Sequence, residues 1–158
     1  MVPDKQIVTF FGVGYTPIAP GTAGALAGGI LFYLLNFALS KAGLGFYTIQ
    51  LLLALLTIIV LLVSVRSIKN IDKSWGHDSQ KIVIDEVVGV WIAMLFIPAT
   101  LLNYLLAFVL FRFFDIAKPL FIRKIDNLKS SWSIMLDDVV AGVYANVCIQ
   151  LLIYFIIY

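Results

Sequence analysis

The chain has 158 residues, of which 62% are hydrophobic, and its formal net charge is +2. Soluble proteins are only about half apolar, so a soluble fold of this length could not hide so much apolar surface. We therefore expect an integral membrane protein with one domain, residues 1–158, and no nucleic-acid partner. A single cysteine, Cys148, and a single histidine, His77, exclude internal disulfides and cysteine- or histidine-rich metal sites.

The amino-terminal segment contains a loop rich in glycine, proline and threonine. Residues 12–22 read GVGYTPIAPGT and lead into the first long apolar run. Thr22 is predicted to be the N-cap of the helix that follows. A helix N-terminus with spare N–H groups can bind an anion. An ordinary capped entry into a membrane helix would give the same pattern, so both interpretations stay open.

Four apolar runs without charged residues follow, at 23–40, 47–65, 87–111 and 139–158. A spanning helix needs about 20 apolar residues, so the first, second and fourth runs are predicted to cross the membrane once. Basic residues follow the second and third runs: Arg66, Lys69, Lys73 and Lys81, then Lys118, Arg123, Lys124 and Lys129. The positive-inside rule places both of these charged segments on the cytoplasmic side.

The third run is longer and carries Pro98 and Asn103 near its middle. A single pass would place the two charged segments on opposite faces of the membrane. We therefore expect Pro98 to break the run into a re-entrant hairpin of two half-helices, each about 16 Å long. The bend would have to be buried in protein, because its backbone polar groups find no water in lipid.

Acidic residues crowd around the ends of these runs. Asp85 and Glu86 precede the third run and have hydrophobic residues on both sides. Acids at a helix start can simply complement the helix dipole, which explains one acid better than two. Asp137 and Asp138 are likewise predicted to open the fourth helix, next to the small residue Gly142.

A third cluster follows the third run. Asp115 and Lys118 are three residues apart, so a last helical turn would place them on one face. Pro119 disfavours a helical Lys118 and marks where the chain leaves the helix. Carboxylates are the ligands that hard cations such as Mg²⁺ prefer, often together with substrate phosphate. The pattern predicts a metal-dependent site for an anionic substrate at a membrane surface.

The motifs GYTPIAPGTAG, IVIDEVVG, FRFFDIAKPLFIRKID and IMLDDVVAG, in this order, resemble those of the phosphatidylglycerophosphatase A family. The resemblance covers about residues 11–142. It implies Mg²⁺-dependent hydrolysis of phosphatidylglycerophosphate to phosphatidylglycerol and phosphate in bacterial phospholipid synthesis. It also implies an all-α, polytopic membrane bundle of about six helices. The enzyme would lie in the cytoplasmic (inner) membrane, among membrane lipids, with its active site facing the cytoplasm.

The residue pattern and the resemblance together predict roles for single residues. The metal ligands would be Asp85, Glu86, Asp137 and Asp138. The catalytic residues would be Asp85, Glu86, Asp115 and Asp138, one of them acting as base or nucleophile. The substrate would be bound by Thr22, Arg112, Lys118 and Arg123. The family usually has proline where Phe121 stands and a Gly-Gly-x-Gly turn at residues 130–133, which leaves fine substrate preference open.

Two other functions are weighed against this one. A phospholipid-head transferase would carry an Asp-Gly-x-x-Ala-Arg core, which the chain lacks. A small ion carrier would place its acids near the middle of the spans, whereas here they lie at the ends.

Overall fold

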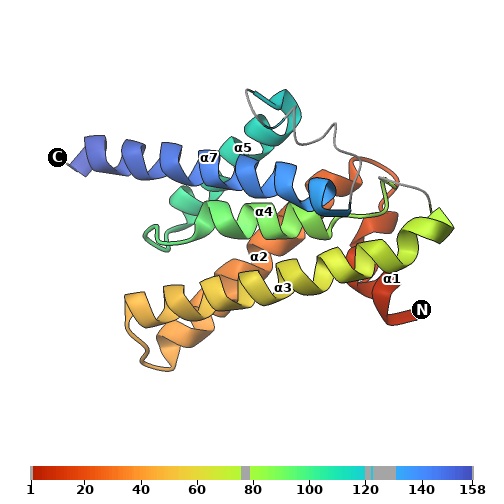
Figure 1. Cartoon of the computed structure of the whole chain (residues 1–158). Coiled ribbons are helices and arrows are strands. Elements are labelled where there is room, and N and C mark those ends of the chain that lie inside the picture. The colour runs from red at the N-terminus through yellow and green to blue at the C-terminus, as the bar shows by residue number, and fades with distance from the viewer. Residues whose placement is uncertain (1, 76–78, 120–121, 123–130, 158) are drawn as a thin grey trace.

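The computed structural model describes residues 2–75, 79–119, 122 and 131–157. Within these ranges the chain is helical and contains no strand, which confirms the predicted all-α fold. The elements are α1 (Val2–Val8), the 3-10 turn η1 (Val13–Tyr15), α2 (Pro20–Lys41), α3 (Phe46–Trp75), α4 (Ile84–Met94), α5 (Leu101–Ala117) and α7 (Ser131–Ile157) (Figure 1).

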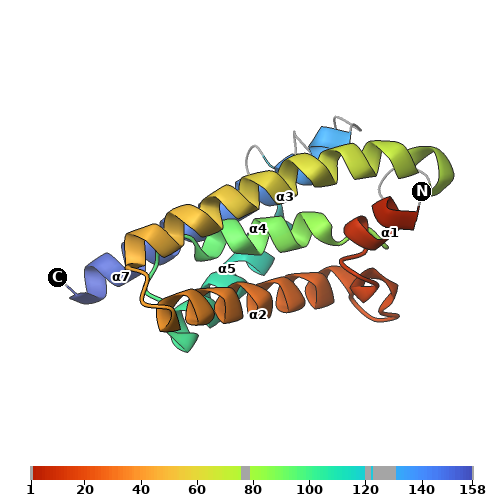
Figure 2. The same ribbon diagram turned by 90° about the horizontal axis from the view of Figure 1, so that it is seen from below.

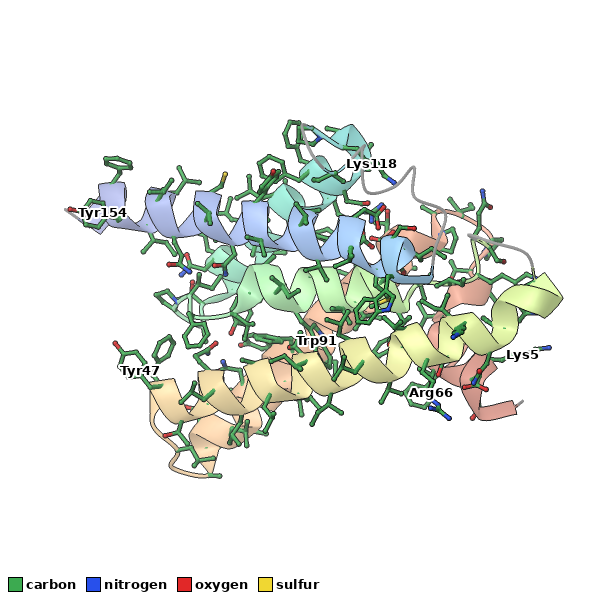
Figure 3. The ribbon with its side chains drawn as sticks, viewed as in Figure 1. Lys5, Tyr47, Arg66, Trp91, Lys118 and Tyr154 are labelled. Atoms are coloured by element: carbon green, nitrogen blue, oxygen red, sulfur yellow. The ribbon has the colours of Figure 1, made fainter. Side chains whose placement is uncertain are left out.

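In the part of the chain that the structure describes, three helices are long and apolar enough to cross a membrane: Pro20–Lys41, Phe46–Ile71 and Trp132–Phe155. They correspond to the first, second and fourth apolar runs, as predicted. The basic residues Lys5, Arg66 and Lys118 lie toward one end of the bundle, whereas Tyr47 and Tyr154 lie toward the other (Figure 3). This separation is typical of a protein whose two ends meet different membrane faces.

The third apolar run is broken, as predicted. α4 ends at Met94 and α5 begins at Leu101, with Pro98 in the connection. The two helices run in opposite directions, so the start of α4 and the end of α5 lie at the same end of the bundle (Figure 1). The predicted equal halves are wrong: α4 has 11 residues and α5 has 17. At 1.5 Å per residue, these lengths are about 16 Å and about 25 Å.

Side chains from the long helices bind the backbone at this break. The Asn146 amide of α7 donates to three carbonyl oxygens at the end of α4, those of Ile92, Ala93 and Leu95. Gln50 of α3 accepts a hydrogen bond from the Phe96 N–H at 2.8 Å. Irregular backbone within a membrane bundle is tolerated only when protein groups satisfy it. These two amides do so for the hairpin.

Helix α4 lies at the centre of the bundle. Figure 2 shows it between α2 and α3, and it also packs against α5 and α7. The indole N–H of Trp91 donates to the carbonyl of Gly28 on α2 at 2.7 Å. A Cβ atom on Gly142 of α7 would lie 2.4 Å from the carbonyl oxygen of Gly89. Glycine therefore allows α7 to approach α4 closely at Gly89.

Candidate active site

A cavity of about 850 Å³ opens at the end of the bundle where the charged residues lie. The loop before α2, the starts of α2, α4 and α7, and the end of α5 form its walls. It brings together all the predicted site residues that the structure describes: Thr22, Asp85, Glu86, Arg112, Asp115, Lys118, Asp137 and Asp138. Arg123 and Phe121 lie outside the described residues.

The first turn of α4 contributes Asp85 and Glu86. One Asp85 oxygen accepts a hydrogen bond from the Glu86 N–H at 3.0 Å. The Glu86 carboxylate reaches across to α2, where a Cβ atom on Gly21 would lie 2.0 Å from its Oε1. Gly21 therefore makes room for Glu86. Nothing in the sequence pattern distinguished this glycine from the others of the loop.

The end of α5 contributes Arg112 and Asp115. Asp115 lies in the last turn of α5, where the helix dipole disfavours a negative charge. Its carboxylate instead pairs with the Arg112 guanidinium at 2.7 Å. Arg112 also pairs with Glu86 and thereby links α5 to α4. Among the described residues, the buried Nε of Arg112 has no hydrogen-bond partner.

Helix α7 contributes two buried acids, Asp137 and Asp138. They were expected to open this helix, but α7 is already helical at Ser131. The two acids therefore lie about two turns inside it, and they do not cap a helix start. One Asp137 oxygen accepts a hydrogen bond from the Asp138 N–H at 3.1 Å. The other Asp137 oxygen is 2.9 Å from the Lys118 ammonium.

Lys118 follows the last residue of α5 in a left-handed conformation, with φ 43°. The predicted exit at Pro119 is confirmed, because the helix ends at Ala117. The prediction that Asp115 and Lys118 share a helical face is therefore wrong, since Lys118 lies outside the helix. Its side chain instead joins the end of α5 to Asp137 of α7.

The predicted cap of α2 is also wrong. The N-cap is Ala19, with φ 49°, and Pro20 occupies the first helical position. Proline has its φ fixed at a helical value and lacks an N–H, so it suits this position. The helix therefore starts before Thr22, which lies in the first turn and still lines the cavity.

Three acids lie close enough to share one metal ion. Carboxylate oxygens of Glu86, Asp115 and Asp138, from α4, α5 and α7, lie within 4.8 Å of one another. An all-oxygen set of this kind suits a hard divalent cation. The group unites two of the predicted metal ligands with Asp115, which was expected in a catalytic role that completes or orients the site.

The acids are costly to hold together without a cation. Burial and the charge of Asp115 raise the pKa of Glu86 to about 7, although Arg112 opposes the change. Burial and the charge of Glu86 raise the pKa of Asp85 well above its usual value. A bound cation favours the ionised form of such groups. The cavity thus combines cation ligands with the basic side chains that an anion needs.

Comparison with known proteins agrees with this chemistry. The family model for phosphatidylglycerophosphatase A matches residues 6–153. A putative phosphatidylinositol-3-phosphatase of Bacteroides thetaiotaomicron is 41% identical over 146 residues, which cover 90% of this chain and 89% of the relative.

Two relatives carry the family's own name. The phosphatidylglycerophosphatase A of Haemophilus influenzae is 39% identical and that of Escherichia coli is 35% identical. The matches cover 93% and 89% of this chain, and 86% and 78% of the two relatives. No solved structure matches the chain. The chain thus belongs to the phosphatidylglycerophosphatase A family of lipid phosphatases.

Proposed function

We propose that this protein removes the terminal phosphate of phosphatidylglycerophosphate in a Mg²⁺-dependent reaction of bacterial phospholipid synthesis. The observation that carries the proposal is the cavity in which acids from three helices meet Arg112 and Lys118. A phosphomonoester with a nearby metal ion needs both kinds of group. The names of the two relatives called phosphatidylglycerophosphatase A support the choice of this lipid as the substrate.

In this proposal Glu86, Asp115 and Asp138 hold Mg²⁺, with Asp85 and Asp137 beside them. When bound, the ion would polarise a phosphoryl oxygen and activate water. The fit rests on the three carboxylate oxygens within 4.8 Å of one another. Mg²⁺ sites in proteins typically consist of oxygen ligands and include only a few protein carboxylates.

The basic side chains bind the substrate. Arg112 and Lys118 line the cavity, where their cationic side chains would bind the phosphate oxygens. Backbone N–H groups in the first turn of α2, around Thr22, add weaker donors. Arg123 remains a proposed contact to the phosphodiester. Binding at these points would orient the phosphorus toward the acids.

Hydrolysis adds water across one phosphorus–oxygen bond. The water oxygen bonds to phosphorus, the bond to the glycerol oxygen breaks, and the glycerol oxygen takes a proton. Inorganic phosphate and phosphatidylglycerol result. Asp85 lies outside the group of three acids and has one oxygen held by the Glu86 N–H. We assign it the role of accepting the proton from water.

The charged end of the bundle would face the cytoplasm of the inner membrane. Lys5, Arg66 and Lys118 all lie toward that end (Figure 3). Basic residues next to spanning helices are retained on the cytoplasmic side.

The test is release of phosphate from phosphatidylglycerophosphate in mixed micelles by the purified protein. We expect activity with Mg²⁺, none with a chelator, and none in Asp138→Asn. Asp4→Asn is the matched control, because Asp4 lies on α1 outside the residues that line the cavity. Full activity in the presence of chelator, or in Asp138→Asn, would overturn the proposed site.

A second substrate has support from one relative. The Bacteroides thetaiotaomicron protein, at 41% identity, is named a putative phosphatidylinositol-3-phosphatase. Phosphatidylinositol 3-phosphate also joins a phosphomonoester to a diacylglycerol phosphodiester, so the same groups could bind it. Comparing kcat/KM for the two lipids in one assay decides between them. We expect phosphatidylglycerophosphate to be preferred, and a preference for the inositol lipid would transfer the proposal to that substrate.

A further inference from the structure

A second, smaller hollow lies on the apolar surface of the same helices that flank the charged cavity. It has a volume of about 120 Å³ and lies between α2 and α5, over Met94 of α4. Leu26 and Ile30 line it on α2, and Leu105 and Phe108 line it on α5. None of its lining residues carries a charge. We name this hollow the α2–α5 groove.

The groove continues from the charged cavity along the same two helices. Thr22 of α2 and Arg112 of α5 line the cavity. Leu26 and Phe108, each four residues away from these, line the groove. Four helical residues span about 6 Å, so the groove starts one helical turn from the cavity. Figure 2 shows α2 and α5 on the same side of α4.

The part of the groove far from the cavity is lined by two tyrosine rings, together with Leu101. Tyr33 and Tyr104 meet edge to face, with ring centroids 6.0 Å apart. The Tyr104 hydroxyl accepts a hydrogen bond from the buried Asn36 amide at 3.1 Å. These contacts fix the rings in place. The groove is therefore an apolar hollow that begins one helical turn from the site and contains two fixed aromatic rings in its far part.

We propose that the α2–α5 groove binds the first part of one acyl chain of the lipid substrate. The proposal rests on the function proposed above and extends it. α2 is one of the candidate spanning helices, so hydrocarbon lies outside the groove. A substrate with its phosphate in the cavity must pass its chains into that hydrocarbon. The groove offers an apolar path that starts one helical turn from Arg112, and an apolar cavity of similar size is known to hold small apolar molecules.

The test fills the groove without touching the charged cavity. Ile30→Trp on α2 and Leu105→Trp on α5 would place a large ring there, at positions 53% and 50% exposed. Leu62→Trp on α3, at a position 54% exposed and away from the groove, is the matched control. Each variant is assayed on long-chain phosphatidylglycerophosphate and on its deacylated, water-soluble headgroup.

We expect both groove variants to lower kcat/KM for the long-chain lipid at least about tenfold, a change of ~1.4 kcal/mol by the usual conversion. Turnover of the deacylated headgroup should stay within about twofold of wild type, a change of under ~0.5 kcal/mol. Leu62→Trp should change neither. An equal loss on both substrates, an equal effect of Leu62→Trp, or no loss at all would overturn the proposal.

Photo-crosslinking separates this proposal from the proposed function. Phosphatidylglycerol with a diazirine on its acyl chain is crosslinked to the protein, and the labelled peptides are mapped. The proposal is supported if residues 26–33 and 101–108 carry more label than α3 and if this excess disappears in Ile30→Trp. This result supports the groove even if the wild type releases no phosphate. In that case the proposed function fails alone. Equal labelling of α3 would overturn the groove.

Discussion

The two ends of the α4–α5 hairpin treat their polar groups in opposite ways. At the turn, amide side chains bind the free backbone groups of the break, as Asn146 does for the end of α4. At the charged end, the carboxylates of Glu86, Asp115 and Asp138 lie close together. Arg112 forms ion pairs with Glu86 and Asp115. One end is close to satisfied within the protein, whereas the other holds an excess of negative charge.

This difference separates structural from functional polar residues. Removing a polar group that only stabilises the fold should lower the stability of the protein and leave phosphate release unchanged. Removing an acid that is retained for a ligand should lower phosphate release. It should change the stability of the protein little, because the repulsion among the acids is relieved. The following predictions test this separation, from the largest expected effect to the smallest.

Asp138→Asn tests the charged end. We expect phosphate release to fall more than about 100-fold, because a proposed metal ligand loses its charge while its shape is kept. Without metal, the variant should unfold at the same temperature as wild type or higher. Phosphate release and thermal unfolding in detergent measure the two effects. A variant that is both inactive and strongly destabilised would show that Asp138 is structural.

Asn146→Leu tests the turn. Three carbonyl oxygens at the end of α4 lose their side-chain donor, and we expect a loss of about 1–3 kcal/mol in the free energy of unfolding. Val147→Leu is the neighbouring control, because Val147 is exposed on the surface of α7. Denaturant unfolding in detergent gives both values. Unchanged stability in Asn146→Leu would mean that the turn does not depend on this amide.

Gly21→Ala tests positioning at the charged end. The new methyl group would displace the Glu86 carboxylate, which lies at the end of a flexible side chain. We expect activity to fall about tenfold with stability unchanged, equivalent to ~1.4 kcal/mol in the barrier. Gly45→Ala is the control, since no atom lies within 4 Å of the Cβ added there. Equal activity of the two variants would remove Gly21 from the site.

Gln50→Leu should have the smallest effect. It removes one hydrogen bond to the Phe96 N–H, worth about 0.6 kcal/mol between membrane helices. It also removes the buried Nε2 of Gln50, which has no hydrogen-bond partner among the described residues. The two changes oppose each other, so unfolding should shift by less than about 1 kcal/mol. A loss as large as that of Asn146→Leu would make Gln50 the main support of the turn.

The sequence predicted the arrangement of the apolar runs because charge and hydropathy are local properties. Pro98 and the basic residues on both sides of the third run sufficed to predict the hairpin. The unequal lengths of its halves could not be read in the same way. Asn146 and Gln50, which come from other helices, bind the backbone just after α4 ends, and a local pattern does not reveal such contacts.

The first residues of α2 and α7, and the set of acids that lie together, were harder to predict from the sequence. The serine-containing stretch before Asp137 looked like a loop, yet α7 is helical from Ser131. Thr22 looked like a cap, but Pro20 is better suited to begin the helix. The place of Asp115 beside Glu86 and Asp138 depends on how three helices pack, which a single sequence does not reveal.

The central claim is that the acids of α4, α5 and α7 form one cation site. Thermal unfolding in detergent during a Mg²⁺ titration tests this claim most directly, in wild type and in Asp138→Asn. A ligand at 100 times its Kd stabilises a protein by about 2.7 kcal/mol, so the wild-type Tm should rise with Mg²⁺. The Tm of Asp138→Asn should not respond. A wild-type Tm independent of Mg²⁺, or an equal rise in the variant, would contradict the account.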